Sequence, residues 1–152
     1  MRVTHSQPFV DAVIDVFGPL AARRAMDVAR VDDAVGFPRV AYAGNGTFLE
    51  VYMDRRERWI TVHLGRVRPD GSVPEYREDF DSWFDLADVL QAKGVLPGKK
   101  VWAIKQPDDP AALRHVLTTL RALVEDHAVD VLDARDESIR LVADVVNKRY
   151  RR

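Results

Sequence analysis

The four histidines are the side chains best suited to acid–base or metal chemistry, and they are scattered along the chain as His5, His63, His115 and His127. A zinc site needs ligands at a recognisable spacing, such as His-x-x-x-His on a helix. His115 and His127 lie on one predicted helix, but they are separated by more than three turns. We therefore expect the histidines at the surface or at the rim of the core, and we expect no metal site.

Carboxylates are concentrated between the predicted sheet and the helix that follows it. Asp81, Asp85 and Asp88 fall on one side of that helix, so they could hold magnesium or meet a basic partner. Acids early in a helix also stabilise its positive end, and a run of charges is usually a solvated face. We therefore favour solvated acids over a metal site. The whole segment contains Glu75, Glu78, Asp79, Asp81, Asp85 and Asp88.

The sequence contains no recognisable nucleophile for acyl transfer. It has no cysteine and no Gly-x-Ser-x-Gly motif, and the one serine beside a histidine is Ser6, next to His5. Gly44-Asn45-Gly46 is too short for a phosphate-binding loop and lacks its lysine. We expect no catalytic residue and no cofactor, which favours binding over catalysis.

Two consecutive runs, residues 47–54 and 58–66, alternate as extended chains do. One face of the pair is purely aliphatic and must be buried under helices. The other face is mixed, and aromatic residues with a polar group are enriched at interfaces. We expect this mixed face to be an interface or the floor of a groove, although a helix could also cover it. Its candidate binding residues are Phe48, Glu50, Tyr52, Trp59, Thr61 and His63.

Turn residues on either side of these runs extend the sheet. Asn45-Gly46 predicts a two-residue hairpin turn that joins residues 39–43 to residues 47–54. Pro69-Asp70-Gly71 predicts a later turn, after which residues 73–80 return as a short, charged edge strand. The pattern predicts a four-stranded antiparallel meander.

Helical periodicity predicts the rest of an α+β fold, in which N-terminal and C-terminal helices pack the sheet. The first helix is expected to be interrupted at Gly18-Pro19 and to continue to about Ala29, before a connection to the sheet. Residues 100–105 could be a fifth strand or an extended tether. The other predicted helices begin at Asp81 or Ser82 and end at Gly94, run from Pro110 to about His127, and begin near Asp136.

Composition limits the classes of protein that fit. With 152 residues and a 47% hydrophobic composition, the chain can form a core of its own, and we expect a single domain over residues 1–152. The absence of cysteine suits a reducing compartment. Neither a signal peptide nor a run of about 20 apolar residues is present, so we expect a cytoplasmic protein with no membrane partner.

Nucleic acid is not favoured as a partner. The formal net charge is −1, so no strong positive field is expected. Arg55, Arg56 and Arg58 cluster at a predicted hairpin tip, but Asp54 and Glu57 lie among them and dilute the local charge.

The hairpin of residues 49–66, followed by a helix containing Phe84-Asp85-Leu86-Ala87-Asp88-Val89-Leu90, resembles small, uncharacterised single-domain α+β proteins of GC-rich bacteria. The excess of arginine over lysine fits such a source. Some similar proteins are immunity proteins, which neutralise a toxin by binding it. The resemblance implies a binding function and transfers no catalytic residue.

Three functions remain open at this point. The first is a bacterial protein-binding module of the immunity type, which binds through the mixed sheet face. The second is a small-ligand or metal-binding enzyme that uses a groove beside the sheet, lined by Tyr52, Trp59 and His63. The third is a structural homodimer formed through the sheet edge or face. The identity of the partner and the oligomeric state are left open.

Overall fold

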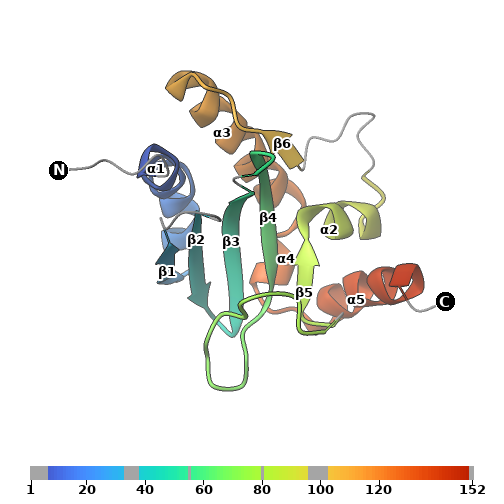
Figure 1. Ribbon diagram of the computed structural model, residues 1–152. Coiled ribbons are helices and arrows are strands. Elements are labelled where there is room, and N and C mark those ends of the chain that lie inside the picture. Colours follow the sequence, from blue (N-terminus) through green and yellow to red (C-terminus); the bar gives the residue numbers. More distant parts are fainter. Residues whose placement is uncertain (1–6, 33–37, 55, 80, 96–102, 151–152) are drawn as a thin grey trace.

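The computed structural model describes residues 7–32, 38–54, 56–79, 81–95 and 103–150. An antiparallel sheet carries the helices on one of its faces, which confirms the α+β class (Figure 1). The strand order is β1–β2–β3–β4–β5, and β6 also pairs with β4, so the described sheet has six strands and not the predicted four. The elements are α1 (Gln7–Arg23), β1 (Asp27–Asp32), β2 (Arg39–Gly44), β3 (Thr47–Asp54), β4 (Trp59–Arg66), β5 (Trp83–Asp85), α2 (Leu86–Ala92), β6 (Ala103–Lys105), α3 (Pro110–His127), α4 (Val129–Leu132) and α5 (Asp136–Tyr150).

The two central hairpins form as the sequence predicts. Asn45 and Gly46 have φ angles of 58° and 78°, and two positive values are what a type I′ turn requires. At the other hairpin tip, Arg56 and Glu57 are exposed to solvent. Arg55 lies outside the described residues.

The predicted fourth strand is wrong. No described residue of the range 73–80 belongs to a strand, and β5 takes the place beside β4, with Trp83 opposite Gly65. Pro74 cannot donate a hydrogen bond to a sheet ladder, which helps to keep this segment out of the sheet.

The helix predicted from Asp81 or Ser82 begins later, at Leu86. Trp83 and Phe84 are both buried, but they belong to hydrophobic clusters on opposite faces of the sheet. Opposite faces require the two-residue period of a strand, which explains why the helix cannot start before them.

The C-terminal end of α2 follows the prediction. Gly94 has a φ angle of 72°, and the Val95 N–H donates to the Leu90 carbonyl at 2.8 Å. These are the features of a Schellman cap, in which a residue beyond the helix folds back on its last turn.

The N-terminal prediction needs two corrections. The helix α1 is not interrupted at Gly18-Pro19, and residues 27–32 form β1, which the sequence had assigned to helix and connection. Proline removes one backbone N–H from the helix. In the same turn, Arg121 of α3 donates to the Val16 carbonyl at 3.2 Å, so a neighbouring helix supports the disturbed backbone.

The aliphatic face is buried beneath the helices, as predicted. The long helix α3 has the predicted bounds, and its first turn is capped by Asp109, whose carboxylate accepts from the Ala112 N–H at 3.1 Å. The last helix, α5, adds Ile139 and Val146 to the same core. The buried aliphatic residues of the central strands are Leu49, Val51, Met53, Ile60, Val62 and Leu64.

The strand left open at residues 100–105 is present as β6, which pairs with the first three residues of β4. Residues 100–102 lie outside the described part of the chain. Within the described ranges, no helix combines the length and the apolar character that crossing a bilayer requires.

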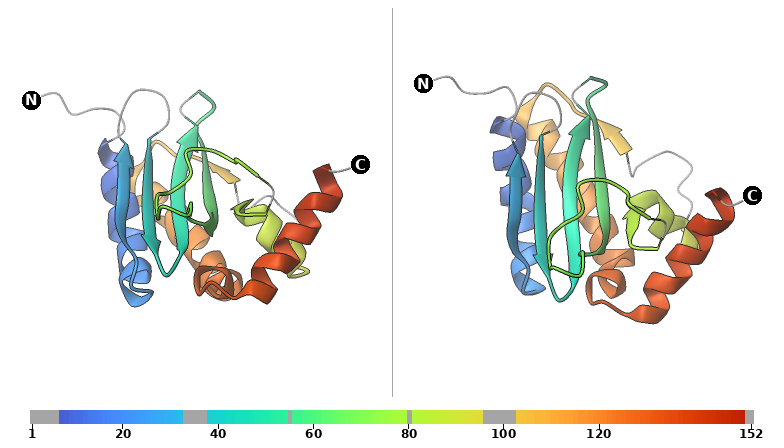
Figure 2. Two further views of the ribbon diagram at one scale, coloured as in Figure 1. Left: turned by 90° about the horizontal axis from the view of Figure 1, so that it is seen from below. Right: turned by 60° about the horizontal axis from the view of Figure 1, so that its bottom comes forward.

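None of the described helices covers the second face of the sheet, and an irregular segment crosses it instead (Figure 2). This segment, residues 67–82 without Phe80, is called the strap below. It runs in front of β3 and β4 before the chain enters β5 and α2 (Figure 2). The strap therefore covers one part of the mixed face and leaves the other part accessible.

Candidate functional site: the aromatic face of the sheet

All six candidate residues lie together on the second face of β3 and β4, which is called the aromatic face below. Glu50 is opposite His63, and Tyr52 is opposite Thr61, in the β3–β4 ladder. Directly opposed residues on one sheet face have Cβ atoms about 5 Å apart. The alternation of two neighbouring strands thus places these side chains side by side. Phe48 and Trp59 mark the two ends of the group.

The strap buries one end of the aromatic face. Phe48 is fully buried and Glu50 is 1% exposed, so neither residue can touch a partner directly. Val73 of the strap packs there with Ala41, Phe48 and Trp83 in a second, smaller hydrophobic cluster. This cluster is separate from the main core beneath the helices.

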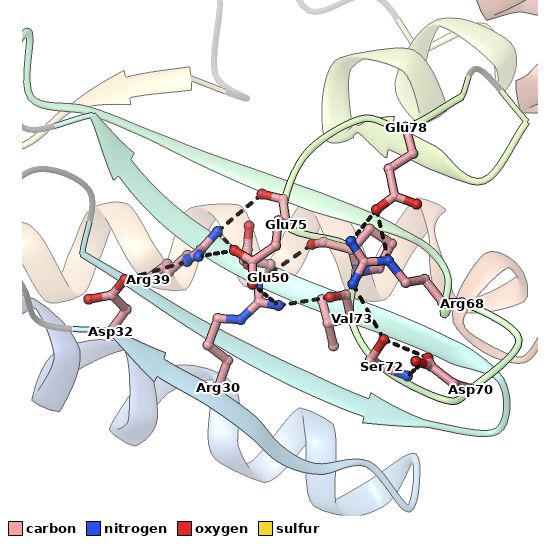
Figure 3. A network of polar contacts seen from close by, with 11 residues as sticks. Arg30, Asp32, Arg39, Glu50, Arg68, Asp70, Ser72, Val73, Glu75 and Glu78 are labelled. Carbon is pink, nitrogen blue, oxygen red and sulfur yellow. Dashed lines mark hydrogen bonds and ion pairs between the residues drawn. The ribbon is translucent and has the colours of Figure 1, made fainter.

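Two arginines hold the strap against the sheet (Figure 3). Arg30 of β1 donates to the Val73 carbonyl at 2.7 Å. Arg39 of β2 donates to the Glu75 carbonyl at 3.2 Å, and its guanidinium pairs with the Glu75 carboxylate at 2.7 Å. Because strands β1 and β2 supply the donors, the strap can remain irregular and still have its Val73 and Glu75 carbonyl groups satisfied.

The same two arginines neutralise the buried carboxylate of Glu50. Arg30 lies 3.4 Å and Arg39 lies 4.0 Å from Glu50 Oε2. A buried ion needs close partners of opposite charge to offset its lost hydration. Arg30 and Arg39 therefore link Glu50 to the strap.

His63 lies between two carboxylates. Its Nδ1 is 3.3 Å from Glu50 Oε1, and its Nε2 is 3.2 Å from Asp85 Oδ1. Burial acts to lower the pKa of His63, but hydrogen bonds to Asp85 and Glu50 outweigh it and raise the pKa above its ordinary value. Burial acts to raise the pKa of Asp85, but the same contact with His63 outweighs it and lowers the pKa. The arrangement stabilises an imidazolium between two carboxylate anions.

A series of ring contacts links strands β3, β5 and β4 on the aromatic face. Ring centroids are 5.3 Å apart for Phe48 and Trp83, 4.9 Å for Trp83 and His63, and 5.4 Å for His63 and Tyr52. These spacings are within the range of favourable aromatic contacts. The series connects the part beneath the strap to the accessible part, so the position of Tyr52 is tied to the buried cluster.

The far end of the strap is anchored on α2 and α5. Arg77 of the strap lies 3.0 Å from Asp88 Oδ2, and Arg149 lies 2.7 Å from Asp88 Oδ1. The Asp85 backbone N–H donates to the same Asp88 carboxylate at 2.9 Å. Burial raises the pKa of Asp88, although this N–H and the two arginines act to lower it. Asp85 and Asp88 thus have structural contacts, in place of a solvated helix start.

The accessible part of the face presents large side chains. Trp59 is 39% exposed and Tyr76, on the strap, is 67% exposed. Tyr52 and Thr61, which are opposite each other on β3 and β4, are half-buried. Arg39 is opposite Tyr52 in the β2–β3 ladder, and it pairs with Glu75 of the strap. Tyr76 is the next residue after Glu75. This group, Tyr52, Trp59, Thr61 and Tyr76, is called the aromatic shelf below.

One part of the geometry resembles a nucleophile with its base. Thr61 Oγ1 is 3.4 Å from His63 Nε2, and Glu50 is on the other side of the imidazole. In a catalytic triad, the base must be neutral and must accept the hydroxyl proton. Here Asp85 is closer to Nε2 than Thr61 is, and the pKa of His63 is raised. Asp85 thus competes with Thr61 for Nε2, and whenever His63 is protonated its ring has no lone pair for the threonine.

Metal chemistry and a ligand cavity find little support in the geometry. In the part of the chain that the structure describes, no three His, Asp or Glu side chains are grouped to hold a metal ion. One hollow of about 470 Å³ lies between the end of α2 and the α3–α4 turn, away from the aromatic face. Its lining includes the ion pair of Lys93 and Asp130.

Sequence reasoning missed several members of this site, among them Arg30, Tyr76 and Arg77. Arg30 was missed because β1 was not predicted, and Tyr76 and Arg77 were missed because the strap was predicted to be a strand. Glu50 carried the one available signal: a charged residue in the middle of a central strand, with apolar neighbours, requires cationic partners if it is buried.

Comparison of the chain with protein-family models, with curated proteins and with solved structures gives no match. The function is therefore argued from the chemistry and geometry of the site itself.

Proposed function

We propose that this chain is a protein-binding module whose partner docks on the aromatic shelf. The observation that carries the proposal is the exposure of Trp59 and Tyr76 beside a fixed network of ion pairs. Tryptophan and tyrosine are enriched among the residues that dominate binding energy at interfaces. The shelf also contains the hydroxyl groups of Tyr52 and Thr61, which suit a partially polar interface.

Rigidity supports this assignment. Ordering side chains on association costs free energy, so a surface that is already ordered binds more tightly. Tyr52 packs on His63, and His63 is held by Glu50 and Asp85. The strap that carries Tyr76 is anchored by Arg39 on one side and by Asp88 on the other. We infer that Glu50, His63 and Phe48 support the shelf from below without touching the partner.

The resemblance to immunity proteins adds a class of partner, a bacterial toxin neutralised by binding. On that basis, we expect the captured partner to be an enzyme whose activity falls as this chain is added. If the enzyme remained fully active at saturating concentrations of the chain, the immunity role would be refuted, but the proposed binding function would not.

The test is affinity capture with matched variants. The wild-type chain, a Trp59→Ala/Tyr76→Ala variant and a Leu141→Ala control are used as bait, because Leu141 is 45% exposed on α5. We expect one stoichiometric partner, whose affinity falls more than about tenfold in the shelf variant and stays unchanged in the control. Equal loss in both variants, or retention in both, would refute the shelf as the docking surface. Thermal unfolding of each variant verifies that it is folded.

The enzyme alternative rests on the contact between Thr61 and His63. Thr61→Val removes the hydroxyl and preserves the shape of the side chain. A thermal-shift screen of metals and nucleotides with wild type and Thr61→Val tests the enzyme alternative, since a ligand specific to the native state raises stability. A ligand that stabilises only the wild type would favour this alternative over the binding module.

A further inference from the structure

We propose that the outer edge of β1 is a second docking site, which takes an extended segment of a partner protein with basic residues flanking apolar ones. In the described part of the chain, β1 is the last strand on its side of the sheet, and no described element pairs with its outer edge (Figure 1). The backbone groups along such an edge are free to accept an additional strand.

Apolar side chains lie along this edge. Val28 is 51% exposed and Val31 is 49% exposed. They are opposite Tyr42 and Val40, whose side chains are in the main core, so both valines are on the helix side of the sheet. Ile14 of α1, 39% exposed, lies about 200° around the helix from Val16, whose carbonyl contacts α3. Ile14 is thus on the flank of α1 turned away from α3.

The other side of the edge is acidic at both ends. Asp27 and Asp32 are opposite Ala43 and Arg39, on the aromatic face of the sheet, and Asp32 also lies 3.9 Å from the Arg39 guanidinium, which it shares with Glu50 and Glu75. Between them, Arg30 is directed inward to Glu50 and the Val73 carbonyl, so its charge is already compensated. A strand added here meets valines on one side and two carboxylates on the other.

This charge pattern selects the occupant. Consider a second copy of β1 that pairs antiparallel with all six residues in register. Val28 of each copy would then oppose Val31 of the other, and Asp27 of each copy would oppose Asp32 of the other. Like charges directly opposite each other destabilise a strand pair, whereas opposite charges stabilise it. The edge therefore disfavours self-association and favours a segment with lysine or arginine at both ends and apolar residues between them. The bulge between Val28 and Arg30 also hinders flat edge-to-edge pairing of two copies.

The probe is a capped synthetic peptide with Lys-Val-Thr-Val-Lys at its centre, titrated to millimolar concentration into the isotope-labelled chain and followed by amide NMR shifts. We expect shifts centred on residues 27–32, and binding that is roughly fivefold weaker when both lysines of the peptide are replaced by glutamate. Asp27→Lys should weaken binding of the lysine peptide and strengthen binding of the glutamate peptide.

Two variants test the apolar side of the edge. Val28→Ser/Val31→Ser should abolish the shifts, and Leu141→Ser, which changes an exposed leucine on α5, should leave them intact. Equal affinity for both peptides, or no shift at β1 with either, would overturn the proposal. So would a dimeric mass in light scattering that reverts to monomer in the valine variant, because a second copy would then occupy the edge.

Discussion

At the scale of single residues, Glu50 holds the aromatic face together. It is 1% exposed, and it contacts Arg30 and Arg39 on one oxygen and His63 on the other. Glu50 therefore connects β3 to β1, β2 and β4, and through the two arginines it also connects the strap to these strands. An isolated buried carboxylate would be strongly destabilising, so the whole group must assemble as a unit.

Glu50→Gln removes the charge with little change in shape. We expect a loss of about 3 kcal/mol in the free energy of unfolding, since the change takes one buried anionic partner from Arg30, Arg39 and His63 at once. Chemical denaturation at pH 7 measures it. The matched control is Glu75→Gln, whose side chain is 52% exposed and should matter much less. Similar losses for the two variants would mean that burial of Glu50 is not what makes it important.

The charge state of His63 gives a dependence of stability on pH. Its folded-state pKa is raised, whereas the unfolded value is about 6.5. The resulting stabilisation is fully present below about pH 6.5 and is lost as the pH rises through the folded-state pKa. We expect the free energy of unfolding to fall with increasing pH in this range, and to fall less steeply in His63→Gln.

NMR titration of the His63 ring tests the same point directly. The midpoint should lie above about 6.5 in the wild type and should move down in Asp85→Asn, which removes one of the two carboxylates. A wild-type midpoint below that value would show that burial dominates. The neutral imidazole would then be available to Thr61, and the enzyme alternative would gain support.

At the scale of elements, the junction between β4 and β5 depends on the absence of a side chain. A Cβ at Gly65 would lie 1.9 Å from the Ser82 carbonyl oxygen. We expect Gly65→Ala to destabilise the chain by more than about 2 kcal/mol, because backbone atoms must move. Gly71→Ala is the comparison: nothing lies within 4 Å of its Cβ, and only the positive φ of 87° opposes the substitution. Thermal denaturation of both variants should show the larger loss at Gly65.

The strap should be the part of the sheet layer that opens most readily. Its side chains are mostly solvated, and Val73 and Pro74 are its buried residues before β5. We expect amide hydrogen exchange in residues 67–79 to be faster than in β3 and β4, and to accelerate further in Arg39→Gln, which removes a strap contact. Exchange as slow as in the central strands would show that the strap is part of the cooperative core.

The elements also show how far the sequence alone could lead. The central hairpins, α3 and the end of α2 were predictable, because their signals are local: an Asn-Gly turn, an Asp-Pro helix start and a glycine cap. The strands β1 and β5 were not, because each is fixed by pairing with another strand, β2 and β4 respectively, and not by a turn or capping residue of its own. The sequence pattern assigns residues 27–29 to the end of the first helix and residues 31 and 32 to a connection, and β5 is three residues long and is stabilised by pairing with β4.

The candidate site was predictable to a similar degree. Alternation placed six residues on one face, and the structure brings all six together. Their division into a buried support and an accessible shelf was not predictable, since it depends on where the strap lies and on an arginine from β1.

At the scale of the whole molecule, the sheet separates two functions. One face packs against the helical core, and the other carries the shelf beside the part that the strap covers (Figure 2). The central claim is that the partner contacts the shelf, while the buried ion pairs hold it in place.

The most direct test is hydrogen–deuterium exchange of this chain with and without its captured partner. We expect slower exchange in residues 50–54, 59–63 and 75–77 on binding, and no change in α5. The account would be contradicted if protection were absent from these three segments and appeared only on the helices, because the aromatic shelf would then have no part in recognition.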